Sequence, residues 1–160
     1  MRIIEGTQSA AGLKFALVVS KYNDFVTDRL QTGAVAALTA AGVRSEDITV
    51  VRVPGAFEIP LAARHAADTR QFDGIVCLGC LIRGATPHFE YISSAVAHGL
   101  TAASGDTGVP MAFGVLTTNS VEEALERAVD GSSNKGWEAA TAAVEMAVVG
   151  AELSRDTSTT

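Results

Sequence analysis

The chain has 160 residues, with 12 Lys and Arg against 18 Asp and Glu, which gives a net charge of −6. Its 48% of apolar residues is too high for a disordered protein, and its acidic balance argues against a nucleic-acid binder. The longest apolar run, residues 74–82, is far shorter than the roughly 18 residues of a membrane span, and the first residues show no signal-peptide pattern, so we expect neither a membrane nor a secreted protein.

Short apolar runs of strand length alternate with helical patterns along the chain. In chain order, the patterns predict a strand at 15–19, a helix at 24–41, a strand at 47–53, a helix at 57–68, a strand at 74–80, a helix at 89–104, a strand at 111–116, a helix from a Ser120–Glu123 capping box to about 129, and a helix at 135–153. This alternation indicates a parallel sheet covered by helices. We therefore expect an α/β fold: a three-layer αβα sandwich around a four-stranded parallel sheet in a flavodoxin-like order.

Two terminal segments do not fit the alternation. Residues 2–5 are strand-like, but only about ten residues without a helix separate them from the next strand, whereas a parallel crossover needs about a dozen or more. This strand either pairs antiparallel or adds to the sheet of a neighbouring subunit, which would also cover apolar surface, and we favour the neighbour. A single domain is expected to span 1–154, with the polar residues 155–160 as a disordered tail.

Ligands of parallel sheets bind outside the carboxyl ends of the strands. Four segments lie at such ends: 20–23, 54–58, 81–88 and 117–119. The densest of them ends at His88, in the first turn of a predicted helix, where free backbone N–H groups bind anions. An imidazole with an ordinary pKa of about 6.5 suits proton transfer near neutrality. The alternative is an ordinary strand–helix loop with a histidine at the helix start.

The other histidines and the two cysteines indicate no metal or redox site. His65 and His98 lie in helices without an acidic or Cys partner at ligand spacing, so we expect them to face solvent. Cys77 and Cys80 form a C-x-x-C pattern, but on a strand they point to opposite faces about 10 Å apart, too far for a disulfide. No second Cys pair completes a zinc site. We predict buried free thiols, which fit a reducing compartment, the cytoplasm.

Two further groups of residues are candidates for ligand binding. Arg127 and Lys135 flank a Gly-Ser-Ser break, where they either hold a phosphate together or are solvated helix-end cations. Tyr22 and Phe57 lie at strand ends, and Phe113 lies within the fourth strand. Each aromatic residue is either part of the core or a flat platform for a heterocycle, and the polar surroundings of Tyr22 favour the platform.

Four segments form a specific combination: Val53-Pro54-Gly55-Ala56-Phe57-Glu58-Ile59-Pro60, Arg83-Gly84-Ala85-Thr86-Pro87-His88-Phe89, Gly114-Val115-Leu116-Thr117-Thr118 and Asn134-Lys135-Gly136-Trp137-Glu138-Ala139-Ala140. Together they closely resemble the 6,7-dimethyl-8-ribityllumazine synthase family of riboflavin biosynthesis. The resemblance covers nearly the whole chain. Gly-x-Thr-Pro-His together with Pro-Gly-x-x-Glu-Ile-Pro is its most specific part.

The resemblance implies a cofactor-free condensation of 5-amino-6-(D-ribitylamino)uracil with 3,4-dihydroxy-2-butanone 4-phosphate. An imine forms, phosphate is eliminated, and ring closure with loss of water gives the lumazine, in the penultimate step of riboflavin biosynthesis. His88 matches the proton-transferring histidine of the family. Ala85 and Thr86 match the positions that hold the phosphate, helped by Arg127, which matches a residue of the adjacent subunit.

The remaining matches are positions that bind the ribitylaminouracil. Those that stack on or wrap its pyrimidine and ribityl chain are Tyr22, Ala56, Phe57, Glu58, Cys80, Leu81 and Ile82, and those that come from the adjacent subunit are Phe113, Lys135 and Glu138. Three of these depart from the family pattern: Tyr22 where Phe is frequent, Phe57 where Trp occurs, and Cys80 where small aliphatic residues are common. Tyr22 keeps the stacking face and adds a hydroxyl, so we expect altered affinity rather than lost function. The thiol of Cys80 is expected only to line the pocket.

The resemblance also implies a pentamer with active sites between neighbours, which some members extend to a hollow 60-subunit capsid of twelve pentamers. Here the helix connection at 131–134 is short, and residues 2–5 contain no proline, which would remove a ladder donor. Both features favour the capsid. Beyond the two small-molecule substrates, riboflavin synthase is a candidate protein partner.

Other functions of similar α/β layers fit less well, since fold alone does not carry function. A receiver domain needs an acidic pair after its first parallel strand, and a flavodoxin needs a Gly-, Thr- and Ser-rich phosphate loop there. Residues 20–23 are Ser-Lys-Tyr-Asn, which is neither. A paralogue that binds riboflavin-type ligands, or builds cages with little turnover, stays open as an alternative.

Overall fold

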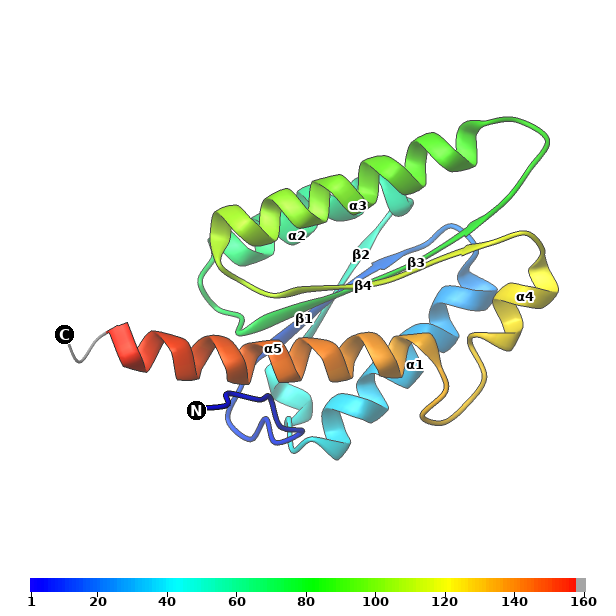
Figure 1. The fold of residues 1–160 in the computed structure, drawn as a ribbon. Helices are drawn as coiled ribbons and strands as arrows, with labels where there is room; N and C mark the ends of the chain where they lie inside the picture. The colour runs from blue at the N-terminus through cyan, green and yellow to red at the C-terminus, as the bar shows by residue number, and fades with distance from the viewer. Residues whose placement is uncertain (158–160) are drawn as a thin grey trace.

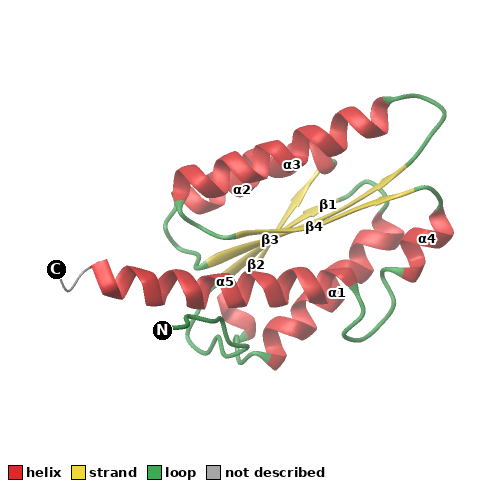
Figure 2. Cartoon of the chain, in the orientation of Figure 1, coloured by secondary structure: helices red, strands yellow, loops and turns green. Residues whose placement is uncertain are grey.

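Four parallel strands form the centre of the computed structural model, which describes residues 1–157 (Figures 1 and 2). They are β1 (Phe15–Ser20), β2 (Ile48–Val53), β3 (Gly74–Ile82) and β4 (Met111–Thr118). Their order across the sheet is β2-β1-β3-β4, and every neighbouring pair is parallel. The predicted four-stranded parallel sheet is confirmed. β3 and β4 both extend past their predicted ends because their ladder continues to the pair Ile82 and Thr118.

Helices cover both faces of this sheet (Figure 1). They are α1 (Asp24–Ala40), α2 (Ile59–Asp68), α3 (His88–Thr107), α4 (Val121–Glu126) and α5 (Lys135–Thr157), with short 3₁₀ turns at Ser45–Asp47 and Ala56–Glu58. α2 and α3 lie on one face, and α1 and α5 lie on the other, which gives the predicted three-layer sandwich. No helix in the described part of the chain combines the length and the apolar character that crossing a membrane requires.

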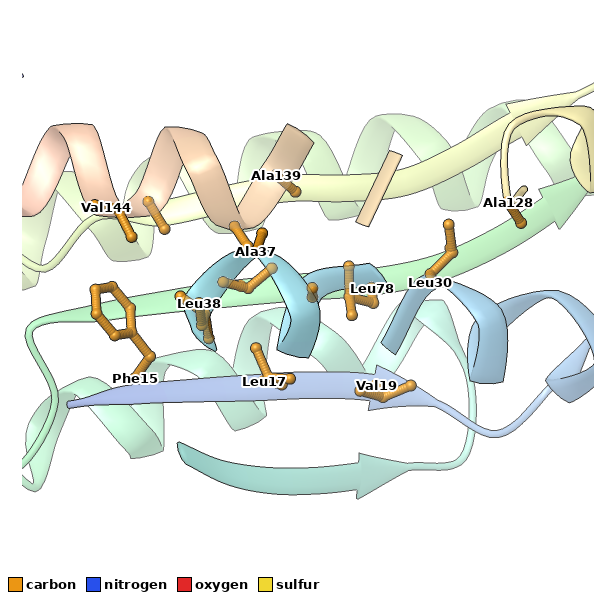
Figure 3. Packing of buried hydrophobic residues seen from close by; sticks show 14 of the residues in the cluster. Phe15, Leu17, Val19, Leu30, Ala37, Leu38, Leu78, Ala128, Ala139 and Val144 are labelled. Atoms are coloured by element: carbon orange, nitrogen blue, oxygen red, sulfur yellow. The ribbon is translucent and has the colours of Figure 1, made fainter. Parts of the chain in front are cut away.

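Alternation along β1 divides the core between the two faces of the sheet. Phe15, Leu17 and Val19 pack in the cluster that α1 and α5 cover (Figure 3). Ala16 and Val18 pack in the opposite cluster, beneath α2 and α3. Every residue of β1 is buried, as expected of a central strand with helices on both sides.

Two glycines and one asparagine bring α1 and α5 into direct contact. A Cβ on Gly136 would lie 2.0 Å from the Leu30 carbonyl oxygen, and one on Gly33 would lie 2.2 Å from Asn134 Oδ1. The buried Asn134 Oδ1 accepts from the N–H groups of Gly136 at 2.7 Å and Trp137 at 3.2 Å, and its Nδ2 donates to a carbonyl of α1 at 3.1 Å. The Asn-x-Gly-Trp segment therefore joins the start of α5 to α1.

Residues 2–5 form no strand in the structure. They precede a segment that packs along α5: a Cβ on Gly6 would lie 2.5 Å from the Glu145 carbonyl oxygen, and Gln8 Nε2 donates to Glu145 Oε1 at 2.9 Å. The four-stranded sheet contains no antiparallel pair, so antiparallel pairing within residues 1–157 is wrong. Addition of this segment to a neighbouring subunit stays a prediction.

The C-terminal helix is longer than predicted. α5 continues through residues 155–157, which were expected to be disordered. Arg155 pairs with Glu152 one turn earlier, and Asp156 pairs with Arg2 at 2.9 Å, so side-chain contacts hold the last turn. The rest of the predicted tail, residues 158–160, lies outside the described residues.

Replacing Gly136 by Ala is expected to lower the free energy of unfolding by about 1–3 kcal/mol, the usual cost of overpacking. The loss should occur although Ala is intrinsically the better helix former by about 1 kcal/mol, because the new Cβ would collide with a backbone oxygen of α1. Gly150→Ala is the matched control on the same helix. Its Cβ meets no atom within 4 Å, so a gain of up to about 1 kcal/mol is expected.

Denaturant unfolding of the parent and both variants at one protein concentration measures these changes. Equal stabilisation by the two substitutions would contradict the close packing of α1 on α5.

Candidate active site

A groove of about 950 Å³ lies at the carboxyl ends of β1, β2 and β3, and we call it the main groove. Its walls come from the loops after these strands and from the first turns of α3. The structure brings eight of the predicted site residues together here: Tyr22, Ala56, Phe57, Glu58, Leu81, Ile82, Thr86 and His88. This is the edge of a parallel sheet at which ligands bind.

The turn between β1 and α1 is tied to both neighbouring strand ends. The Tyr22 N–H donates to the Pro54 carbonyl at 3.1 Å. Asn23 adopts a left-handed conformation, with φ at 60°, and its Nδ2 donates to the Cys80 carbonyl at 2.9 Å. Asn tolerates this conformation better than most residues. Sequence reasoning missed Asn23, and the signal for it was an Asn directly before a helix start.

Four Phe and Tyr side chains line the main groove, and three of them, unlike the half-buried Phe89, are mostly exposed. Tyr22, Phe57 and Tyr91 are 71%, 63% and 73% exposed. Rings of this kind offer flat apolar faces to a heterocycle, or to another protein surface. Tyr91 was not predicted. It follows His88 by three residues on α3, and the i, i+3 spacing of helical neighbours was the available signal.

The turn between β3 and α3, residues 84–87, is exposed and leads directly into His88. Within residues 1–157, no backbone acceptor is bonded to the N–H groups of Gly84, Ala85 or Thr86. The turn precedes α3, a 20-residue helix whose N-terminus carries the positive end of the helix dipole. An anion at this turn would lie beside the imidazole. Ala85 lies on the turn but does not line the main groove.

A second groove, of about 330 Å³, lies along β4, which is an edge strand of the sheet, and we call it the edge groove. It is lined by Phe113 of β4, by Arg127 just after α4, and by Lys135 and Glu138 in the first turn of α5. Lys135 Nζ pairs with Glu138 Oε2 at 2.9 Å. The two grooves share no lining residue, so the structure divides the predicted site into two parts.

The two parts differ in charge. Within the described chain, no Lys or Arg lines the main groove, where Glu58 carries the one permanent charge. The edge groove contains Arg127, Lys135 and Glu138, and the last two pair with each other. The permanent cations that line a groove in the described chain therefore belong to the edge groove, whereas the main groove is lined by none.

The start of α4 is capped partly as predicted. Ser120 Oγ accepts from the Glu123 N–H at 3.2 Å, but the Glu123 carboxylate accepts from the Asn119 N–H at 2.9 Å instead of from Ser120. At the other end of the helix, Arg127 Nη1 donates to the Glu123 carbonyl at 3.0 Å. The capping residues thus hold both the loop before α4 and the arginine after it.

Cys80 does not line the main groove, contrary to the expectation that its thiol does. Strand alternation turns its side chain toward α1, where it is 2% exposed, while Cys77 faces α2 and α3. The two free, buried thiols on opposite faces are confirmed. Burial raises the pKa of Cys77 to about 12 and that of Cys80 to about 11. His65 and His98 are exposed, as predicted.

Comparison with known proteins identifies relatives over nearly the whole chain. A sequence profile described as 6,7-dimethyl-8-ribityllumazine synthase matches residues 12–150. A protein of Syntrophus aciditrophicus (strain SB), named 6,7-dimethyl-8-ribityllumazine synthase, is 54% identical over 144 residues, which cover 90% of this chain and 94% of the relative. Every residue assigned to the two grooves lies within residues 12–150.

Neither cysteine is expected to react with an aromatic disulfide reagent in the folded protein at about pH 8. The thiolate is the reactive form, and burial both blocks access and raises the pKa of each thiol well above this pH. Both thiols should react once the chain is unfolded in denaturant. The absorbance of the released reagent counts them.

Ser133→Cys, at an exposed position, provides the positive control and should add one fast-reacting thiol. Rapid reaction of a thiol in the folded parent would contradict the burial of Cys77 or Cys80.

Proposed function

The chain belongs to the 6,7-dimethyl-8-ribityllumazine synthase family, and we propose that its active site forms where the main groove of one copy meets the edge groove of another. The enzyme condenses 5-amino-6-(D-ribitylamino)uracil with 3,4-dihydroxy-2-butanone 4-phosphate to 6,7-dimethyl-8-ribityllumazine. The division of charge carries the proposal. The imidazole and the exposed turn lie in a groove without Lys or Arg, and the candidate phosphate cations lie in the other groove.

In this site the primary amine of the pyrimidine attacks the ketone, and loss of one water gives an imine. His88 moves protons in this step and in the elimination that follows. His88 is the first residue of α3 and lies on the wall of the main groove, where its imidazole can accept and donate protons to a bound substrate. Ring closure on the ribitylamino nitrogen then releases a second water.

The phosphate leaves from the turn at residues 84–87. The N–H groups of Ala85 and Thr86 and the N-terminus of α3 stabilise its negative charge, which grows as the C–O bond breaks. Arg127 of the neighbouring copy adds the permanent cation that the main groove lacks, with a planar fork suited to phosphate oxygens.

The pyrimidine stacks on Tyr22, with Phe57 on the same groove and Phe113 from the neighbouring copy. Tyr22 and Phe57 are mostly exposed in one chain and Phe113 is about half exposed, so contact with substrate and with the second copy would cover them. Residues 56–58 and 80–82 surround the pyrimidine and the ribityl chain, Cys80 through its backbone. Lys135 and Glu138 of the neighbour face the polar end of the substrate.

The proposed assembly is a pentamer, extended to a 60-subunit capsid. Large apolar side chains are exposed on both sides of the sandwich, including Leu61 on α2 and Met146 on α5. A soluble protein covers such side chains in subunit contacts. We place the enzyme in the cytoplasm, where buried free thiols persist. Riboflavin synthase, which consumes the lumazine, is the proposed protein partner.

A shared site predicts complementation between two variants, assayed at a concentration of the phosphorylated ketone far below the raised KM of Arg127→Ala, where each variant alone is nearly inactive. His88→Ala is expected to lower turnover by about 100-fold through loss of proton transfer, and Arg127→Ala to raise KM for the phosphorylated ketone. When the two variants are unfolded, mixed in equal amounts and refolded, about one quarter of the interfaces in a ring should pair an intact His88 with an intact Arg127. Formation of the lumazine, followed by its absorbance, should recover to about that fraction of the parental rate.

Each variant refolded alone is the control. A mixture whose rate is only the mean of the two variants would place the whole site within one chain. A parent that makes no lumazine above the uncatalysed background would instead support the riboflavin-binding paralogue.

Light scattering coupled to size-exclusion chromatography tests the assembly. We expect a particle with the mass of sixty chains, because the connection at 131–134 is short and residues 2–5 pair with no strand within residues 1–157. A stable species of five chains would contradict the capsid but keep the shared site. An active monomer would contradict both.

A further inference from the structure

Arg83 links the two halves of the proposed site within one chain. We propose that Arg83 is a positioning residue, which holds the turn at residues 84–87 in the shape that receives the phosphate. This inference rests on the proposed function, because it assigns a task to that turn. The Arg83 guanidinium is engaged by Asn119, Glu90 and the Phe89 ring, so we assign it a role through these neighbours and not on the substrate.

Arg83 contacts two elements at once. Its own N–H donates to the Thr118 carbonyl at the end of β4, at 2.8 Å. Its Nε donates to Asn119 Oδ1 at 3.0 Å, and its Nη1 donates to Glu90 Oε1 at 2.8 Å. The guanidinium also lies over the Phe89 ring, 4.8 Å from its centroid. One side chain thus joins the loop after β4 to the first turn of α3.

The turn at residues 84–87 has few other restraints. In the described chain, the acceptor it offers is the Pro87 carbonyl, which receives the N–H groups of Glu90 and Tyr91 within the start of α3. All four residues of the turn are exposed. An anion site made of backbone N–H groups depends on the direction of each group, so a turn this loosely held needs fixed ends. Arg83 supplies both fixed ends, one through Asn119 and one through Glu90.

The hydrogen bonds continue past Asn119 to the edge groove. The Asn119 N–H donates to the Glu123 carboxylate at 2.9 Å, and the Glu123 carbonyl accepts from Arg127 Nη1 at 3.0 Å. A series of hydrogen bonds through Asn119 and Glu123 therefore connects Arg83, beside the phosphate turn, to Arg127, which the same chain gives to the neighbouring site. These bonds hold the main groove and the edge groove of one chain in a fixed position relative to each other.

The contacts call for Arg and not Lys. A guanidinium directs donors to two partners in one plane while its face covers an aromatic ring. Lys at this position would keep the positive charge but lacks the planar fork that directs separate donors to Glu90 and to Asn119. Arg83→Lys should therefore lose less of this function than Arg83→Ala, so the two substitutions form a graded pair.

The experiment measures steady-state kinetics with each substrate varied in turn, for Arg83→Ala, Arg83→Lys, Asn119→Ala and the Arg83→Ala/Asn119→Ala double variant. Asn119→Ala removes the side-chain acceptor but leaves its backbone N–H to cap α4. Arg64→Ala is the matched control, since Arg64 is a comparably exposed arginine that pairs with two carboxylates, Asp68 and Asp106, away from both grooves.

We expect Arg83→Ala to raise KM for 3,4-dihydroxy-2-butanone 4-phosphate by about tenfold, as misplacement of a binding group does, while KM for the pyrimidine changes by less than about twofold. Arg83→Lys should fall between parent and Ala. Because the pair acts as one unit, the double variant should be no worse than Arg83→Ala alone. The assembly and the Arg64→Ala kinetics should stay as in the parent.

Three results would overturn the proposal. These are an unchanged KM for the phosphorylated ketone in Arg83→Ala, equal losses for both substrates together with a changed assembly, and effects of Arg83→Ala and Asn119→Ala that multiply in the double variant. Arg127→Ala, run beside them, separates two failures. If it alone raises this KM, only the positioning role is wrong, and if neither variant does, the phosphate assignment itself is wrong.

Discussion

The parallel pairing of β3 with both β1 and β4 is the constraint on which the rest of the structure depends. Parallel strands end at one edge of the sheet, so the loops after β1, β2 and β3 meet there and build the main groove. The ladder reaches Ile82 and Thr118, which brings Arg83 beside the loop after β4. Helices must return each strand to the other end, and their bulk on both faces explains why β1 is wholly buried.

The same sheet also leaves β4 at an edge, and the edge groove lies along that strand. Phe113 stands 48% exposed there, with Lys135 and Arg127 nearby. The chain therefore carries two incomplete binding surfaces that share no residue. Exposed rings on one and cations on the other have little use in an isolated chain, but they would complement each other in the proposed ring of identical copies, in which every contact is heterologous.

Local sequence patterns were sufficient for most of the fold and for much of the site. Strands and helices follow from apolar periodicity, and alternation alone predicted the opposite burial of Cys77 and Cys80. What failed depends on contacts between distant residues. The last turn of α5 is polar and looked disordered, yet Arg2 holds Asp156 from the other end of the chain. The Cys80 error has a different cause: the family match implied that its thiol lines the groove, but strand alternation turns this side chain into the core beneath α1.

The chemistry itself gives a reason to share the site. Imine formation and ring closure both release water, and charge on a departing phosphate is stabilised best where solvent is excluded. The main groove is open, and its Tyr22 and Tyr91 rings are mostly in contact with solvent. In the proposed shared site, a second copy that brings Arg127 would also bring the protein surface that excludes water, so the cation would arrive together with the low-dielectric surroundings that strengthen its attraction for phosphate. One subunit contact thus supplies both the charge and the environment in which that charge acts, and a chain with both grooves complete would need a larger domain to achieve the same.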